Sequence, residues 1–260
     1  MWCAPALRRR ALVAAALVGL VGGLPVPPPA CAAGDALEGA LRRLQADDIL
    51  VADAAVEELV AIGAPAVDAL LPLLADPRRD VRAGAVRALG LLGDARAAAP
   101  IRTGLEASLG QDRPDTMEDR YLRILRIQAL GRLRDADSLP LLRRVAESGD
   151  DFERAHAGIA LFLSGADPGY DLARECLGAS EMAIRNLVTE GLAESDDSRV
   201  ATLVLPLTQD DSWVVRDTAF RTLRRFRGDA PVAEAFARGR QDPSWYVRET
   251  VAEIDRGARP

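Results

Sequence analysis

The stretch DPRRDVRAGAVRALG, residues 76–90, contains the pattern on which the fold prediction depends. Val81, Ala85, Ala88 and Leu89 follow at the i, i+4, i+7 and i+8 spacing of an apolar stripe on an α-helix. The Asp-Pro step before the stripe suits a helix start, because Asp favours the N-cap and Pro the first helical position. The Gly-Asp step after it suits a helix end, since Gly readily adopts the left-handed turn there. The stretch therefore predicts one helix with defined ends.

The same helix pattern returns along the chain, each time with an arginine near its start. The intervals between these arginines are 41, 31, 31, 31 and 32 residues, and the longer first interval indicates an insertion near residues 107–118. A helix pair of about 31 residues cannot bury its apolar face alone, whereas stacked pairs share one core. The period therefore predicts an all-α solenoid, an αα-superhelix of about six to seven helix pairs. The arginines are Arg82, Arg123, Arg154, Arg185, Arg216 and Arg248.

The first 33 residues have a different character. Three arginines at 8–10 precede an uncharged apolar run at 11–24, a proline-rich break and the small residues around Cys31. This is the layout of a secretory signal peptide, and the run is shorter than the roughly 20 residues that span a bilayer. We expect a signal peptide at 1–33, a solenoid at 34–260 and export to the bacterial periplasm or cell envelope. An uncleaved anchor and a lipidated Cys31 are the weaker alternatives.

Three stretches carry a family resemblance. Residues 76–90, the segment DSWVVR at 211–216 and the segment DPSWYVR at 242–248 resemble the bacterial HEAT repeat. The short period is similar to the HEAT-like class of the phycobilin lyases, and the resemblance covers roughly residues 47–258. It implies an armadillo-like solenoid that serves as a scaffold or binding surface. It also leaves open a lyase-like role that handles a chromophore or another small ligand.

Composition narrows the function. The chain has 260 residues, with 33 basic residues, 39 acidic residues and His156 as its one histidine. Removing residues 1–33 takes away three arginines and no acid, so 30 minus 39 leaves a charge near −9, which disfavours nucleic-acid binding. Cys176 is then the single cysteine, and we expect a quiet, partly buried thiol there. We find no catalytic set and expect no metal and no cofactor.

Two readings of the arginine series stay open. Each guanidinium pairs with an Asp or with helix-end carbonyls in its own or a neighbouring turn, or the series forms a cationic ladder for an acidic ligand. The first is favoured, because Asp76, Asp210 and Asp242 each lie six residues before an arginine. These six arginines are therefore expected to be structural.

The candidate partner-binding residues are Trp213, Trp245 and Tyr246. The two tryptophans occupy the same repeat position, 32 residues apart. Aromatic residues beside arginine are favoured at binding hot spots, but they also brace the packing between repeats. The C-terminal end is the best place for a partner surface on this sequence.

Two further features receive a structural interpretation. We expect His156 to be a structural or surface residue, because it has no second histidine or cysteine near it in sequence. The acidic insertion, with Asp112, Asp115, Glu118 and Asp119, lacks a calcium-loop pattern and is expected to be a solvated loop.

The sequence thus predicts an exported, non-catalytic module for protein–protein binding or scaffolding. The alternatives are a lyase-like or small-ligand-handling HEAT protein and a lipid-anchored subunit of an envelope assembly. The expected partner is another protein and not a nucleic acid. A membrane becomes a partner only if Cys31 is lipidated or the leader is retained.

Overall fold

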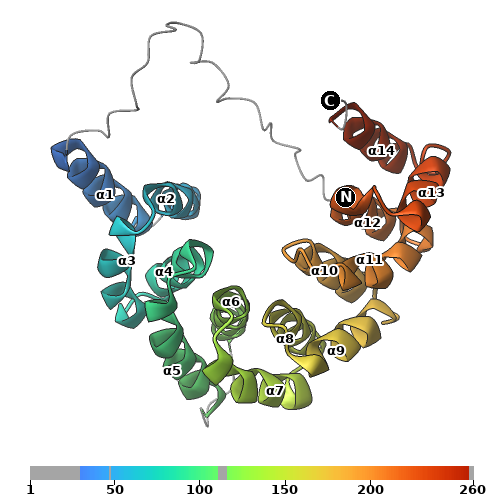
Figure 1. Ribbon diagram of the computed structural model, residues 1–260. Helices are drawn as coiled ribbons and strands as arrows, with labels where there is room; N and C mark the ends of the chain where they lie inside the picture. Colours follow the sequence, from blue (N-terminus) through green and yellow to red (C-terminus); the bar gives the residue numbers. More distant parts are fainter. Residues whose placement is uncertain (1–29, 47, 111–115, 258–260) are drawn as a thin grey trace, which may run out of the picture.

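The computed structural model describes residues 30–46, 48–110 and 116–257, and every regular element in these ranges is a helix. Figure 1 shows an open arc of two layers, with odd-numbered helices outside and even-numbered helices inside. The predicted all-α solenoid is confirmed, with seven helix pairs in the described residues. The outer helices are α1 (Ala30–Leu44), α3 (Pro65–Leu70), α5 (Ala98–Leu109), α7 (Leu139–Ser148), α9 (Asp167–Leu177), α11 (Arg199–Val204) and α13 (Ala230–Gly239). The inner helices are α2 (Ile49–Ile62), α4 (Arg79–Leu92), α6 (Met117–Leu133), α8 (Asp151–Leu163), α10 (Met182–Leu192), α12 (Trp213–Leu223) and α14 (Trp245–Gly257).

Short polar side chains set where the inner helices begin. Asp76, Asp210 and Asp242 each accept the backbone N–H two residues later at 2.8 Å, and the helix starts one residue beyond. Asp150 caps α8 directly through the N–H groups of Phe152 and Glu153. These bonds satisfy donors that a helix start leaves free.

Thr116 is the N-cap of α6 and forms a capping box with Asp119. Asp115 lies outside the described residues, as do the other residues at 111–115 of the expected insertion.

The expected leader falls almost wholly outside the described residues, which begin at Ala30. None of the described helices is long and apolar enough to cross a membrane. The structure therefore describes the repeat region alone.

The core forms two apolar clusters that meet at α8. Ala157, Ala160 and Leu161 belong to the N-terminal cluster, whereas Ile159 and Phe162 belong to the C-terminal one. Helix α8 therefore presents one face to each half of the arc.

Candidate functional site

Four of the six repeat arginines are anchored in the same way. The Nη1 atom of each donates to the backbone carbonyls five and six residues earlier, in the turn before its own helix. The distances are 2.6 to 3.2 Å in all four cases. Each contact satisfies carbonyl groups that the preceding turn leaves exposed. The four are Arg82, Arg185, Arg216 and Arg248.

Two of these arginines also bind the following repeat. The Nε and Nη2 atoms of Arg185 contact the carboxylate of Asp210 at 2.7 and 2.8 Å. Arg216 contacts Asp242 in the same way, at 2.8 and 2.9 Å. Burial raises the pKa of both carboxylates, but the hydrogen bonds from the arginine and from a backbone N–H outweigh it and hold the pKa below 3.8. All three nitrogen atoms of these two guanidinium groups therefore form hydrogen bonds within the protein.

Arg82, Arg123 and Arg154 do not pair with a turn Asp, because the next repeat lacks this residue. The residues six before the following arginines are Met117, Ser148 and Ala179. Buried Glu153 instead supplies the carboxylate for Arg123, at 2.8 Å. Arg154 pairs with Glu175 on the outer helix α9.

Large apolar side chains gather along one edge of the inner layer. Contacts from the first turn of one inner helix reach the turn before the next, so the starts of α10, α12 and α14 lie together. Eight of the nine large hydrophobic side chains exposed in the described residues lie within the first five residues of an inner helix, and Leu91 is the exception. We call these eight the apolar edge: Leu50, Met117, Tyr121, Phe152, Met182, Trp213, Trp245 and Tyr246.

The three expected partner-binding residues form one aromatic stack at the C-terminal end of this edge. Tyr246 lies between the tryptophans, 4.7 Å from Trp213 and 3.8 Å from Trp245 between ring centroids. Between 43% and 57% of each side chain remains exposed. The stack therefore joins α12 to α14 and still presents aromatic surface to solvent.

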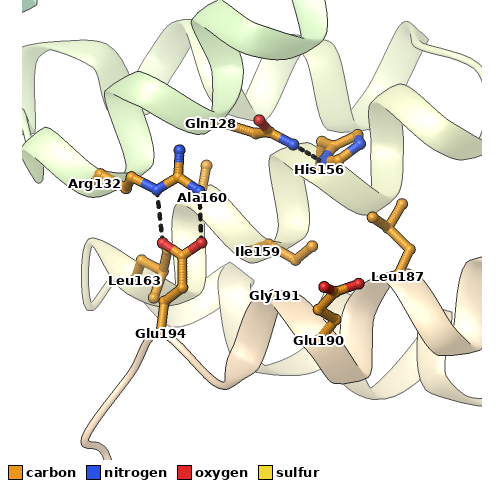
Figure 2. Close-up of a pocket in the computed structure, with 10 residues that line it drawn as sticks. All are labelled: Gln128, Arg132, His156, Ile159, Ala160, Leu163, Leu187, Glu190, Gly191 and Glu194. Carbon is orange, nitrogen blue, oxygen red and sulfur yellow. Dashed lines mark hydrogen bonds and ion pairs between the residues drawn. The ribbon is translucent and has the colours of Figure 1, made fainter. Parts of the chain in front are cut away.

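A pocket opens on the inner layer between α6, α8 and α10 (Figure 2). We call it the inner pocket, a cavity of about 240 Å³. Arg132 and Glu194 close one side with two hydrogen bonds of 2.6 and 2.7 Å, from α6 to the residue two positions past α10. Glu190 also lines it and has no side-chain partner within the described part of the chain. The apolar lining consists of Ile159, Ala160, Leu163, Leu187 and Gly191.

His156 forms the buried wall of the inner pocket. Burial and the nearby Arg132 charge lower the pKa of its imidazole to about 4, so the ring is neutral near pH 7. Gln128 Nε2 lies 3.3 Å from His156 Nδ1. Because the amide nitrogen only donates, Nδ1 accepts and the ring proton lies on Nε2. The pocket lining contains two carboxylates, Glu190 and Glu194, and one arginine, Arg132, so it carries one excess negative charge. This lining suits a small ligand with an apolar body and a cationic group.

Apart from His156, the polar residues of the inner pocket belong to no motif that is visible in the sequence alone. A signal was present in the repeat register. Gln128 and Glu190 lie five residues after a repeat arginine, and Arg132 and Glu194 lie nine residues after one. Polar residues at matching positions of two repeats, separated by one apolar repeat, mark the two walls of a site between them.

Buried Cys176 lies on α9, outside the inner pocket, and burial raises the pKa of its thiol. No group of three or more potential metal-binding side chains occurs in the described ranges.

Comparison with known proteins identifies the repeat. Residues 37–113 match the family model described as HEAT repeats. A search of curated proteins found no match.

Three solved structures are similar to this chain over most of its length. A chain in the complex of CpcE and CpcF of phycocyanin lyase from Nostoc sp. PCC7120 has a TM-score of 0.55 and 16% identity, covering 92% of this chain and 99% of that chain. Human deoxyhypusine hydroxylase in complex with glycerol has a TM-score of 0.40 and 15% identity, covering 87% and 96%. An engineered protein has a TM-score of 0.34 and 17% identity, covering 85% and 97%. At these identities the first likeness shows a common fold.

Proposed function

Since the chain is a HEAT-repeat protein, we propose that it is a non-catalytic module that binds another protein along the apolar edge. The observation that carries the proposal is the gathering of eight exposed apolar side chains at the starts of the inner helices. Single exposed hydrophobic residues are common, but eight at equivalent helix starts along one layer indicate an interaction surface. The similar fold in a complex of two lyase subunits supports protein binding as a use of this architecture.

The charge of the apolar edge favours a protein over a nucleic acid. Asp151, Glu181 and Asp211 are exposed at the same helix starts and have no side-chain partner in the described ranges. These carboxylates repel phosphate groups, whereas a protein surface can meet both the apolar side chains and their polar rim.

The test is affinity capture from envelope extract with full-length tagged protein. We expect Phe152→Ala and Met182→Ala to reduce capture of a specific partner by about tenfold each, as loss of interface anchors does. Leu91→Ala is the matched control, because Leu91 is exposed but lies outside the apolar edge. Capture that survives both edge substitutions, or an extract with no specific partner, contradicts the proposal.

We further propose that the protein works in the periplasm or cell envelope. The basic, apolar and proline segments of residues 1–33 support this. Cell fractionation and mass spectrometry of the mature N-terminus test it. Cleavage near Ala32 supports export, a lipid on Cys31 identifies an anchored assembly subunit, and an intact Met1 in the cytosolic fraction contradicts export.

The inner pocket favours a second candidate function, the handling of a small ligand. Its buried neutral histidine, unpaired Glu190 and apolar lining make it a concave site with few polar groups. Native mass spectrometry and the absorption spectrum of protein purified from its own host test this candidate. A bound small molecule that is lost in Glu190→Gln supports it, and a ligand-free protein in both measurements opposes it.

A further inference from the structure

Arg248 is the last of the repeat arginines, and one edge of its guanidinium group has no partner among the described residues. Its Nη1 atom lies 2.6 and 3.1 Å from the carbonyls of the preceding turn, against 2.7 and 3.2 Å for Arg216. The two guanidinium groups are therefore held by the same backbone anchor. At Arg216 the remaining Nε–Nη2 edge binds Asp242 of the next repeat, whereas at Arg248 that edge has no partner among the described residues and the side chain is exposed. A guanidinium group that is held in place and permanently charged is well suited to bind a carboxylate through two hydrogen bonds.

A second contact is open at the same place. Trp213 and Trp245 are equivalent by repeat register, and the ring of Trp213 is stacked by Tyr246 of the next repeat. Trp245 touches Tyr246 on its own helix, but no following repeat stacks on it in the described residues, and 57% of it is exposed. The last repeat thus exposes a guanidinium edge and a tryptophan ring, the two groups through which the preceding repeat binds its neighbour.

Both existing contacts come from one turn. Asp242 binds Arg216 and Tyr246, four residues later, stacks on Trp213. An Asp followed four residues later by an aromatic residue at a helix start is therefore the unit that fits this receptor.

We propose that the C-terminal end docks a second helical-repeat protein, whose first accessible turn carries this Asp-x-x-x-aromatic unit and extends the solenoid. The carboxylate binds the open edge of Arg248, and the aromatic ring stacks on Trp245. This inference rests on the proposed protein-binding function and names the kind of partner.

A second copy of this chain does not fit. The first described inner helix carries Ala52 where later repeats have the arginine. In this register the position of the turn Asp, six residues earlier, holds Ala46, and the aromatic position, two residues earlier, holds Leu50, so both parts of the unit are missing. The proposed occupant is therefore a repeat protein that carries this unit, and not the described N-terminal end of a second copy.

Photo-crosslinking in the native host tests the proposal. Full-length protein with p-benzoylphenylalanine in place of exposed Glu249 is irradiated, and the crosslinked peptides are mapped by mass spectrometry. We expect a crosslink to one helical-repeat partner, within a few residues of an Asp-x-x-x-aromatic helix start. Arg248→Ala in the same background should reduce its yield at least tenfold.

Two controls separate the outcomes. Arg238→Ala removes another exposed arginine, whose side chain has no partner among the described residues, so the yield should not change. Phe152→Ala probes the apolar edge far from the C-terminal end. If Phe152→Ala abolishes partner capture and Arg248→Ala leaves the crosslink intact, the docking inference fails and the proposed function stands.

Other results also overturn the inference. These are a crosslink to a second copy, a crosslink to a partner segment without the Asp unit, or no crosslink at all. If no partner is captured by any version of the protein, the proposed function fails as well. A charge exchange, Arg248→Asp with the partner Asp changed to Arg, should restore part of the crosslink when the pairing is correct.

Discussion

At the scale of single residues, the repeat arginine performs two tasks in two of the repeats. Its Nη1 atom holds the turn of its own repeat, and its remaining edge binds the next repeat, as Arg216 and Arg185 show.

The recurring Asp and Arg made pairing predictable from sequence. What was not predictable is the substitution of Glu153 for a missing turn Asp, because a carboxylate at an apolar helix position gives no local sign that it faces Arg123.

The pair between Arg216 and Asp242 should contribute measurably to stability. Arg216→Ala leaves Asp242, whose side chain is 6% exposed, without its charged partner. We expect a loss of about 3 kcal/mol, since breaking a buried pair strands the remaining charge. Thermal unfolding followed by circular dichroism should show a melting temperature lower by several degrees.

A double-mutant cycle provides the control for this pair. Arg216→Ala with Asp242→Ala should cost less than the sum of the two single changes, because neither charge is then stranded. Strict additivity, or an unchanged melting temperature in Arg216→Ala together with loss of a ligand, would instead support the ligand-binding interpretation of the arginine series.

His156 should make stability depend on pH in a defined window. Its pKa is lowered from 6.5 to about 4, so the unfolded chain binds the proton more readily than the folded one. The stability contribution is therefore complete above pH 6.5 and is lost as pH falls from 6.5 to 4. At pH 5 the loss is about 2 kcal/mol.

Urea unfolding at pH 7.5 and pH 5 measures this effect. The drop in unfolding free energy should be larger for the wild type than for His156→Gln. Asp210 and Asp242 do not confuse the comparison, because their lowered pKa values place their loss of stability below pH 3.8. Equal drops in the two proteins would show that His156 titrates normally.

At the scale of helices, the inner layer depends on small residues where helices cross. A Cβ at Gly131 would lie 2.6 Å from Ala160 Cα, and one at Gly90 would lie 2.9 Å from Ala129 Cα. The helix stripes and the small-residue composition were visible in the sequence, and they predicted the paired helices. The sequence did not indicate which glycine lies against the backbone of a neighbouring helix, because that depends on where the helices of two repeats cross rather than on the local pattern.

Gly131→Ala should therefore destabilise the protein although alanine is the better helix former. The neighbour is backbone and cannot rotate away, so we expect a cost of about 2 kcal/mol from overpacking. Gly39→Ala on α1 is the matched control, since its new Cβ meets only the flexible end of Arg43 at 3.4 Å. Gly39→Ala should stabilise by up to about 1 kcal/mol. Chemical unfolding of both variants measures the opposite signs, and a stabilised Gly131→Ala would disprove the close crossing.

At the scale of the whole molecule, the arc consists of two halves joined at α8. The two apolar clusters both use this helix, and the inner pocket lies against it. Repeats contact mainly their neighbours, so a local loss of packing spreads along the arc less than it does in a globular domain. The 31-residue period predicted a repeat array. It could not predict where the core divides, because that follows from which face of α8 each side chain occupies.

Core substitutions in the two halves should therefore loosen different parts of the arc. Leu223→Ala on α12 and Leu89→Ala on α4 each remove a fully buried side chain, at about 3 kcal/mol apiece. Hydrogen exchange followed by mass spectrometry should show faster exchange in α10, α12 and α14 for Leu223→Ala while α2 and α4 keep their protection. Leu89→Ala should give the reverse. Each substitution serves as the control for the other, and a uniform acceleration along the chain in both would mean that the arc unfolds as one unit despite its divided core.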